Sequence, residues 1–146
     1  MRKGFTLVEL LIILVIIAIL MGASFYWIYQ WLFARKIEGD VNKIYTALTS
    51  AQLTARREKI TVTVSFLNST ALQINASGKV SYVTLLTPFN MTESQISINE
   101  IGLFNPPRPI DIYSQFYGKT TLNCVRVYIT KVCEGSWDGS KCVCRF

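Results

Sequence analysis

Glu9 is the residue that is hardest to reconcile with its surroundings, because it is an acid among apolar residues. It is the one acid in a long apolar run, and the stretch from Leu10 to Ala34 carries no formal charge. A carboxylate inside a membrane helix costs about 2.5–3.5 kcal/mol even on the mildest insertion scale. The isolated chain supplies no obvious cation to offset this cost, so the pattern predicts that Glu9 pairs with a cation from another molecule.

The second group of residues that could be reactive consists of four cysteines near the C-terminus: Cys124, Cys133, Cys142 and Cys144. In a short exported domain such cysteines are first interpreted as disulfides, which stabilise by about 2–4 kcal/mol each. The alternatives are free thiols or a four-cysteine zinc site. Structural zinc sites use Cys-x2–4-Cys pairs, whereas the spacings here are nine, nine and two, so the sequence favours disulfides.

The order of the cysteines favours one of the three pairings that four cysteines allow. Cys142 and Cys144 are two residues apart, so in a strand they face the same side and do not easily bond each other. Cys133 and Cys142 flank a candidate hairpin loop at 134–141, which predicts the bridges Cys133–Cys142 and Cys124–Cys144. This prediction needs a bulge or a strand end between Cys124 and Cys133, because an unbroken strand would point them to opposite sides.

The chain offers little for catalysis. It has no histidine, which is the commonest general base and metal ligand. Gly78 and Gly118 are typical of turns, and no glycine-rich phosphate loop follows a predicted strand. The acids of the C-terminal half share no common spacing and are expected to be solvated: Glu93, Glu100, Asp111, Glu134 and Asp138. We therefore expect no enzymatic activity, no cofactor and no metal site.

Basic and aromatic residues alternate near the C-terminus. The cations are Lys119, Arg126, Lys131, Lys141 and Arg145, interleaved with Tyr117, Tyr128, Trp137 and Phe146. Such a set can hold a phosphate backbone and stack bases, which makes Lys131, Lys141 and Arg145 candidate nucleic-acid contacts. The alternative is a solvated sheet face beside a disulfide loop. The net charge of +6 is weak support, because two of the cations lie in the first three residues.

A long N-terminal helix is the element that must position Glu9. No proline interrupts the chain from Phe5 to about Lys59, and a helix of this length would extend roughly 80 Å. Residues 5–33 are apolar enough to span a bilayer, with aromatic residues gathered at the end of the run. Residues 34–59 are amphipathic, with one apolar stripe at spacings of three and four: Ile37, Val41, Ile44, Leu48, Ala51 and Ala55.

After Lys59 the apolar period changes to two, which predicts strands. The candidates are Ile60–Leu67, Ala71–Asn75, Lys79–Leu86, Gln95–Leu103, Ile110–Tyr113, Leu122–Val132 and Lys141–Phe146. Turn residues separate them, and Pro106, Pro107 and Pro109 disfavour both helix and central strand. The predicted fold class is α+β, with a long protruding helix whose second half packs on an antiparallel sheet.

The stretch Gly4-Phe5-Thr6-Leu7-Val8-Glu9-Leu10, behind a short basic leader, closely resembles the prepilin signature of bacterial type IV pilins and type II secretion pseudopilins. The resemblance implies that a prepilin peptidase removes residues 1–4, that Phe5 becomes N-methylated, and that Glu9 pairs with the terminal amine of a neighbouring subunit. An ordinary secretory signal or a plain signal anchor is the alternative. The first has an apolar region of only about 7–15 residues.

The resemblance also implies an organisation and a location. Residues 5–33 would anchor the precursor in the inner membrane with the N-terminus inside, and residues 34–146 would form a periplasmic domain of helix 34–59 and sheet 60–146. The partners would be other subunits, the prepilin peptidase and the membrane, before assembly into a periplasmic or extracellular filament. The expected function is that of a structural subunit of a type IV pilus or a type II secretion pseudopilus.

The helix end Arg56-Arg57-Glu58, followed at once by Ile60–Phe66, looks like the minor pilins and pseudopilins of the type called FimT or GspH. Many type IV pilins carry proline at the position of Tyr26, and its absence here favours a pseudopilin or a specialised minor subunit. Some FimT-like proteins use a basic C-terminal tail in DNA uptake. A DNA-binding minor pilin for natural transformation is therefore the alternative function, although residues 141–146 contain fewer arginines than those tails.

Overall fold

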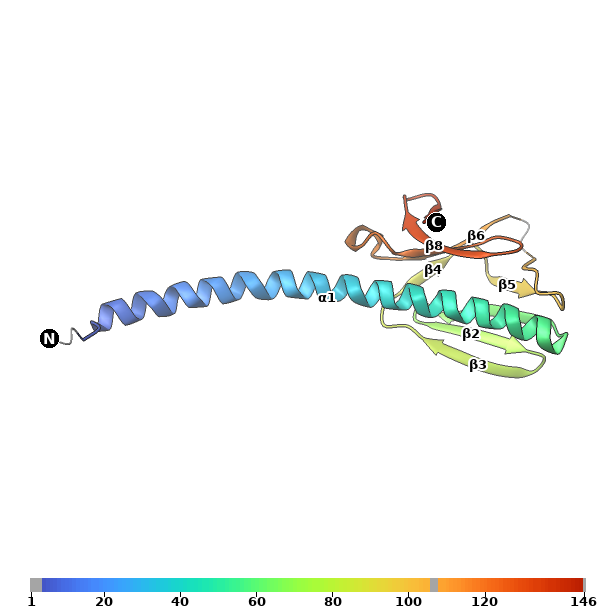
Figure 1. Ribbon diagram of the computed structural model, residues 1–146, viewed down its shortest axis with the longest axis horizontal. Helices are drawn as coiled ribbons and strands as arrows, with labels where there is room; N and C mark the ends of the chain where they lie inside the picture. Colours follow the sequence, from blue (N-terminus) through green and yellow to red (C-terminus); the bar gives the residue numbers. More distant parts are fainter. Residues whose placement is uncertain (1–3, 106–107, 146) are drawn as a thin grey trace. The chain divides into compact units, whose positions relative to one another are not determined.

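The computed structural model describes residues 4–105 and 108–145. The expectations about the leader residues Met1–Lys3, about Pro106 and Pro107, and about Phe146 lie outside these residues. The chain divides into two compact units, Met1–Phe33 and Ala34–Phe146. Figure 1 shows the course of the chain and the labels of its elements.

One helix, α1 (Leu7–Glu58), accounts for more than a third of the chain. At its start the Thr6 hydroxyl accepts a hydrogen bond from the amide of Glu9 at 3.3 Å, as an N-cap residue does. At its end Lys59 has a φ of 55°, and the Ile60 amide reaches back to the Ala55 carbonyl at 3.3 Å. These are the features of a left-handed C-terminal cap, and the predicted helix is confirmed to within two residues at each end.

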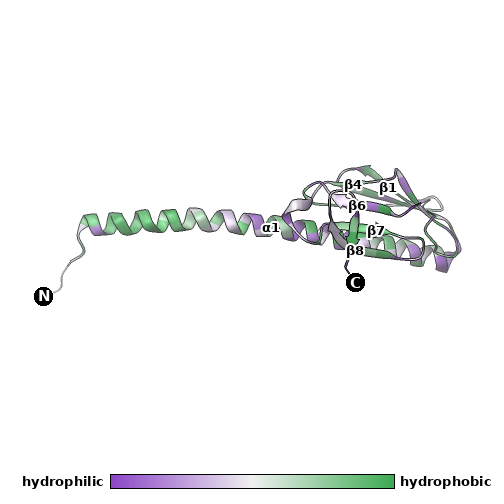
Figure 2. Cartoon of the chain, turned by 90° about the horizontal axis from the view of Figure 1, so that it is seen from above, coloured by the Kyte–Doolittle hydropathy of each residue, from purple (hydrophilic) through white to green (hydrophobic). Residues whose placement is uncertain are grey.

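The N-terminal unit consists of the first half of α1. Its described residues from Gly4 to Tyr29 are all exposed in the isolated chain, although most of them are apolar (Figure 2). By length and composition this is a helix that could cross a membrane. An apolar helix with no buried side chain requires lipid or other helices around it.

The C-terminal unit packs the second half of α1 against two antiparallel sheets. The first has the order β3-β2-β1-β5 and is made of β1 (Val62–Asn68), β2 (Ala71–Ala76), β3 (Lys79–Thr84) and β5 (Gln95–Ile98). The second has the order β4-β6-β7-β8-β9 and is made of β4 (Phe89–Met91), β6 (Ile110–Ser114), β7 (Cys124–Val127), β8 (Val132–Trp137) and β9 (Cys142–Cys144). The predicted α+β class is confirmed, with two sheets in place of one.

The apolar stripe of α1 forms the centre of the core. All six positions predicted from the spacing are buried: Ile37, Val41, Ile44, Leu48, Ala51 and Ala55. Alternate residues of the strands cover them, among them Val62 and Val64 from β1 and Ile112 and Val125 from the second sheet. The helical period of the sequence therefore predicts this half of the core correctly.

The strand prediction is wrong in the C-terminal third. Instead of one strand at 122–132, β7 ends at Val127, and a tight turn in which the Tyr128 amide donates to the Lys131 carbonyl leads into β8. The turn contains no Gly, Pro, Asn or Asp, so its composition does not distinguish it from the β-rich residues around it. Conversely, the first half of the expected loop at 134–141 is strand, because β8 continues to Trp137. Gly135 pairs with both β7 and β9, and Ser136 pairs with β9.

Candidate functional site

The candidate processing and assembly site lies at the start of α1. Phe5 is 74% exposed, and Glu9 is exposed in the first turn of the helix. A carboxylate there is stabilised by the helix dipole, and the Thr6–Glu9 spacing is that of a capping box. The ion pairs among the described residues are Arg35–Glu38, Lys43–Asp40 and Arg126–Asp111. Glu9 belongs to none of these pairs.

Asp40 is a buried polar centre that the sequence analysis missed. Its side chain is fully buried, and its two carboxylate oxygens accept hydrogen bonds from the amides of Leu86 and Thr87 at 2.8–3.1 Å. The Thr87 hydroxyl donates another at 2.8 Å, and the Lys43 ammonium lies 3.5 Å away. The carboxylate thus ties the connection between β3 and β4 to the helix. Its position within the apolar stripe was the signal that could have revealed it.

All four cysteines are in disulfides, as expected, but the predicted pairing is wrong. The bridges are Cys124–Cys142 and Cys133–Cys144, with Cα–Cα distances of 5.9 and 5.7 Å. The physical reason is the register of the β8–β9 hairpin, in which Cys142 lies opposite Trp137. Cys133 is four residues further along β8, about 13 Å away at the rise of a strand. Cys133–Cys142 is therefore out of reach.

The turn at 128–131 also explains how Cys124 and Cys133 can face the same side of the sheet although they are an odd number of residues apart. Because β7 and β8 are separate strands, with Arg126 opposite Cys133 and Cys124 opposite Gly135, both cysteines face the same side of the sheet. Gly135 lets the backbone of β9 come close, since a Cβ at this position would overlap the Val143 carbonyl. This close approach brings Cys142 over Cys124.

A second, smaller core lies on this face of the second sheet. Cys124, Trp137 and Cys142 are buried together, and Tyr113 stacks on Trp137 with ring centroids 4.0 Å apart and planes 7° from parallel. Burial of the Trp137 ring, partial burial of the Tyr113 ring and their parallel stack stabilise the packing of β8 and β9. The two bridges and this stack hold the C-terminal strand in place.

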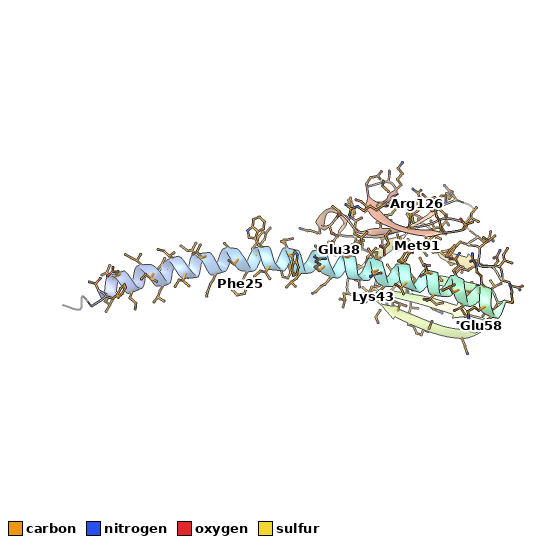
Figure 3. The ribbon with its side chains drawn as sticks, in the orientation of Figure 1. Phe25, Glu38, Lys43, Glu58, Met91 and Arg126 are labelled. Atoms are coloured by element: carbon orange, nitrogen blue, oxygen red, sulfur yellow. A yellow bond between two sulfur atoms is a disulfide. The ribbon has the colours of Figure 1, made fainter. Side chains whose placement is uncertain are left out.

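Asp111 and Arg126 form an ion pair next to this core. They face each other across β6 and β7, and the Asp111 carboxylate lies 3.3 Å from Arg126 Nε. Neither atom has a hydrogen-bond partner within the described part of the chain, so the contact is mainly ionic. The Arg126 Nη1 donates to the Cys142 carbonyl at 3.1 Å (Figure 3 labels Arg126). Burial raises the pKa of Asp111, while Arg126 and the Cys142 amide oppose that rise.

The other four acids that the sequence analysis considered lie in different parts of the fold. Burial raises the pKa of Glu134, and its Oε1 has no hydrogen-bond partner among the described residues. The amides of Lys141 and Ser140 lower the pKa of Asp138, which closes the β8–β9 turn. Glu93 and Glu100 lie in irregular segments of the chain. We find no arrangement of these acids, within the described residues, that resembles paired catalytic carboxylates.

The three candidate nucleic-acid contacts fall into two groups. Lys131 lies in the β7–β8 turn with its ammonium 5.7 Å from the Tyr128 ring centroid, and Arg145 follows Cys144, whose sulfur is 3.9 Å from the Tyr128 hydroxyl. Lys141 is in the β8–β9 turn, at the other end of the six-residue strand β8. At the rise of a strand this separation is about 20 Å, so Lys141 lies apart from Lys131. The backbone of Arg145 lies beside β8, where its amide donates to the Glu134 carbonyl at 2.9 Å.

The N-terminal segment matches a known family model. Residues 1–25 match a family model described as the prokaryotic N-terminal methylation motif. This motif and a helix that packs its second half on antiparallel sheets both support a resemblance to type IV pilins.

Among solved structures, the chain is similar to the type IV minor pilin FimU of Pseudomonas aeruginosa strain PAO1. The TM-score is 0.55 at 15% sequence identity, and the match covers 72% of this chain and 95% of the chain in that structure. At this identity the likeness concerns the fold. No curated protein sequence matches the chain.

Proposed function

We propose that this chain is a membrane-inserted precursor of a filament subunit, either of a type IV pilus or of a type II secretion pseudopilus. A prepilin peptidase cleaves it after Gly4, Phe5 is then N-methylated, and the helix segment 5–33 leaves the lipid to pack against helices of neighbouring subunits. The role is structural and not enzymatic. The methylation motif at residues 1–25 and the fold shared with the minor pilin FimU support this proposal.

The observation that carries the proposal is the exposed carboxylate of Glu9 in the apolar first half of α1, where the residues from Leu10 to Ala34 carry no formal charge. In a lipid-embedded monomer this charge is costly, whereas in a filament it meets the amine that cleavage creates at Phe5 of another subunit. Assembly therefore replaces an unfavourable environment with an ion pair. This difference favours the filament over the isolated membrane-embedded subunit.

Glu9→Ala tests the role of the acid. We expect the variant to insert and fold but to enter filaments at least about tenfold less than the unaltered chain, since loss of the pair removes more than about 1.4 kcal/mol. The measurement is the ratio of filament to membrane protein after shearing and immunoblotting. Glu58→Ala, which removes an exposed acid from the other end of α1 (Figure 3), is the matched control. Normal incorporation of Glu9→Ala would exclude the assigned role.

Processing is tested separately, by intact mass and N-terminal sequencing of the membrane protein. We expect a mature chain that begins at a methylated Phe5, and a Gly4→Val variant that keeps its leader. A mature chain that begins elsewhere would contradict the proposed cleavage without affecting the assignment of the fold.

A DNA-binding minor pilin is the second candidate function. The observation that favours it is the grouping of Arg126 and Lys131 at the Tyr128 ring, each 5.7 Å from the ring centroid, which combines cations with an aromatic face. The distance of Lys141 from this group weakens it. A gel shift with the detergent-solubilised chain over a salt series tests it: binding that falls steeply with salt supports the candidate, and no shift at low salt excludes it.

A further inference from the structure

One glutamine side chain joins three segments of the C-terminal unit that are distant in sequence. Gln52 lies near the end of α1, and its amide nitrogen donates to the Gly102 carbonyl at 2.7 Å and to the Thr130 carbonyl at 3.2 Å. Gly102 belongs to the loop after β5, and Thr130 belongs to the turn between β7 and β8. The end of the helix, this loop and this turn therefore meet at one place.

Each of the three joined segments presents an exposed aliphatic side chain. Leu53 is 59% exposed, Ile101 is 60% exposed and Ile129 is 56% exposed. Each of them is the direct neighbour in sequence of a residue in the glutamine contact. Single exposed aliphatic residues are normal, but several that gather inside a polar rim mark an interaction surface. We call these three residues the aliphatic centre.

Hydrogen bonds fix the backbone that carries the aliphatic centre. The Phe104 amide donates to the Ile129 carbonyl at 2.8 Å, and Arg56 Nε donates to the Ile101 carbonyl at 3.1 Å. Gly102 has a φ of 78°, and a Cβ at this position would overlap the Arg56 side chain. The loop and the turn are thus already ordered, so a partner that binds here has little chain to immobilise.

Basic residues surround the aliphatic centre. The segments 52–60, 99–105, 108–109 and 128–131 carry five cations against two acids, all of them exposed: Arg56, Arg57, Lys59, Arg108 and Lys131 against Glu58 (labelled in Figure 3) and Glu100. Arg108 lies near the β7–β8 turn, because it comes just before Ile110, which pairs with Val127. Within the described residues, Arg57 and Arg108 take part in no ion pair. We call the five cations the basic rim.

The charge of the rim and the chemistry of the centre select one kind of partner. A second copy of this chain would bring the same positive charge to the contact, and like charges that face each other across an interface oppose binding. A nucleic acid would match the charge, but it binds through phosphates and stacked bases, for which aliphatic side chains offer no stacking face. A protein surface with an apolar centre and an acidic rim matches both features.

We propose that the aliphatic centre and the basic rim form a docking surface for an acidic protein. Carboxylates of the partner pair with the rim, and its apolar residues cover Leu53, Ile101 and Ile129. This inference goes beyond the role of a filament subunit, and it depends neither on membrane insertion nor on Glu9.

The test is photo-cross-linking of the full chain in the cells that produce it, with p-benzoylphenylalanine in place of Ile129. The matched control carries the same amino acid in place of Leu67, which is 61% exposed at the other end of β1. We expect a protein adduct at position 129 but not at position 67. Mass spectrometry should find more Asp and Glu than Lys and Arg in the cross-linked peptide of the partner.

Charge reversal tests the rim. Arg57→Glu/Arg108→Glu should reduce the yield of the adduct at least about tenfold, because it places like charges opposite the partner's acids. Lys119→Glu/Lys141→Glu makes the same change in net charge at the other end of β7 and β8 and should leave the yield unchanged. Hydrogen exchange of the β7 and β8 amides shows whether the first variant is folded.

A salt series on the unaltered chain in the membrane fraction is the second measurement, because salt screens exposed charges. A yield that does not fall with salt overturns the proposal, even if the charge-reversal variant fails to fold. The proposal is also overturned by an adduct with a second copy of this chain, with a nucleic acid or with a peptide that is not acidic. The absence of an adduct above the control, or a folded charge-reversal variant with unchanged yield, has the same consequence. None of these results affects the proposed role in a filament.

Discussion

Replacing Asp40 by Ala should be among the most damaging single substitutions in the globular unit. The buried carboxylate accepts from two backbone amides and one hydroxyl at 2.8–3.1 Å. Hydrogen bonds to a charged group contribute about 1.5–3 kcal/mol each, and they are not additive. Removing one member of a buried charged cluster typically costs about 3–5 kcal/mol. We expect a loss in this range, a large part of the roughly 5–15 kcal/mol that stabilises a domain.

The assay is hydrogen exchange of the full chain in detergent, followed by mass spectrometry. In Asp40→Ala the amides of Leu86 and Thr87 should lose protection first, because the carboxylate is their acceptor, and denaturant should unfold the globular unit earlier. Thr87→Val removes only the hydroxyl donor and should cost less. Asn42→Ala, at an exposed position of the same helix, should change stability by less than about 0.5 kcal/mol. A loss below about 1 kcal/mol for Asp40→Ala would refute the reasoning.

Three further predictions concern the second sheet. The double variant Cys133→Ser/Cys144→Ser should keep one bridge and no free thiol, whereas Cys133→Ser/Cys142→Ser should leave two reactive thiols. Thiol tagging by mass spectrometry distinguishes them, and the reverse result would restore the other pairing. Gly135→Ala should destabilise by about 1–3 kcal/mol, since its Cβ meets the β9 backbone; unchanged denaturant unfolding would contradict this close approach. Burial raises the pKa of Glu134, so its ionisation opposes folding, and its contribution to stability falls as pH rises above about 4. Glu134→Gln should therefore gain stability relative to the unaltered chain from pH 4 to pH 7 in urea titrations, and a constant difference would exclude this.

The parts of the structure that sequence reasoning predicts well depend on local patterns. The helix follows from an uninterrupted run of compatible residues, and its buried stripe from spacings of three and four. The first strands, from β1 to β3, follow from alternation and from turns rich in Asn, Ser and Gly. In each case the residues that determine the structure are neighbours along the chain.

The prediction is wrong where a turn has the composition of a strand, or where the determining residues are distant in sequence. The turn at 128–131 is composed of residues that also suit strands, so only the pairing of β7 with β8 reveals it. The acceptor role of Asp40 depends on the loop at Leu86 and Thr87, almost fifty residues away. The position of Asp40 within the apolar stripe indicates its burial, but nothing near it in the chain indicates which groups donate to its carboxylate.

The sequence by itself determined the candidate processing site at Gly4 and Phe5, the lone acid Glu9, the helix and the apolar face of its second half. Each of these properties depends on residues that are close together in the sequence, so it does not depend on how the rest of the chain folds. The tertiary structure alone decided which cysteines bond, because the register of the strands sets the distances between them. In the β8–β9 hairpin Cys142 pairs with Trp137, so Cys133 is out of reach of Cys142, which bonds Cys124. It also decided that Asp40 is a buried anchor, because only packing brings the acceptor and its donors together.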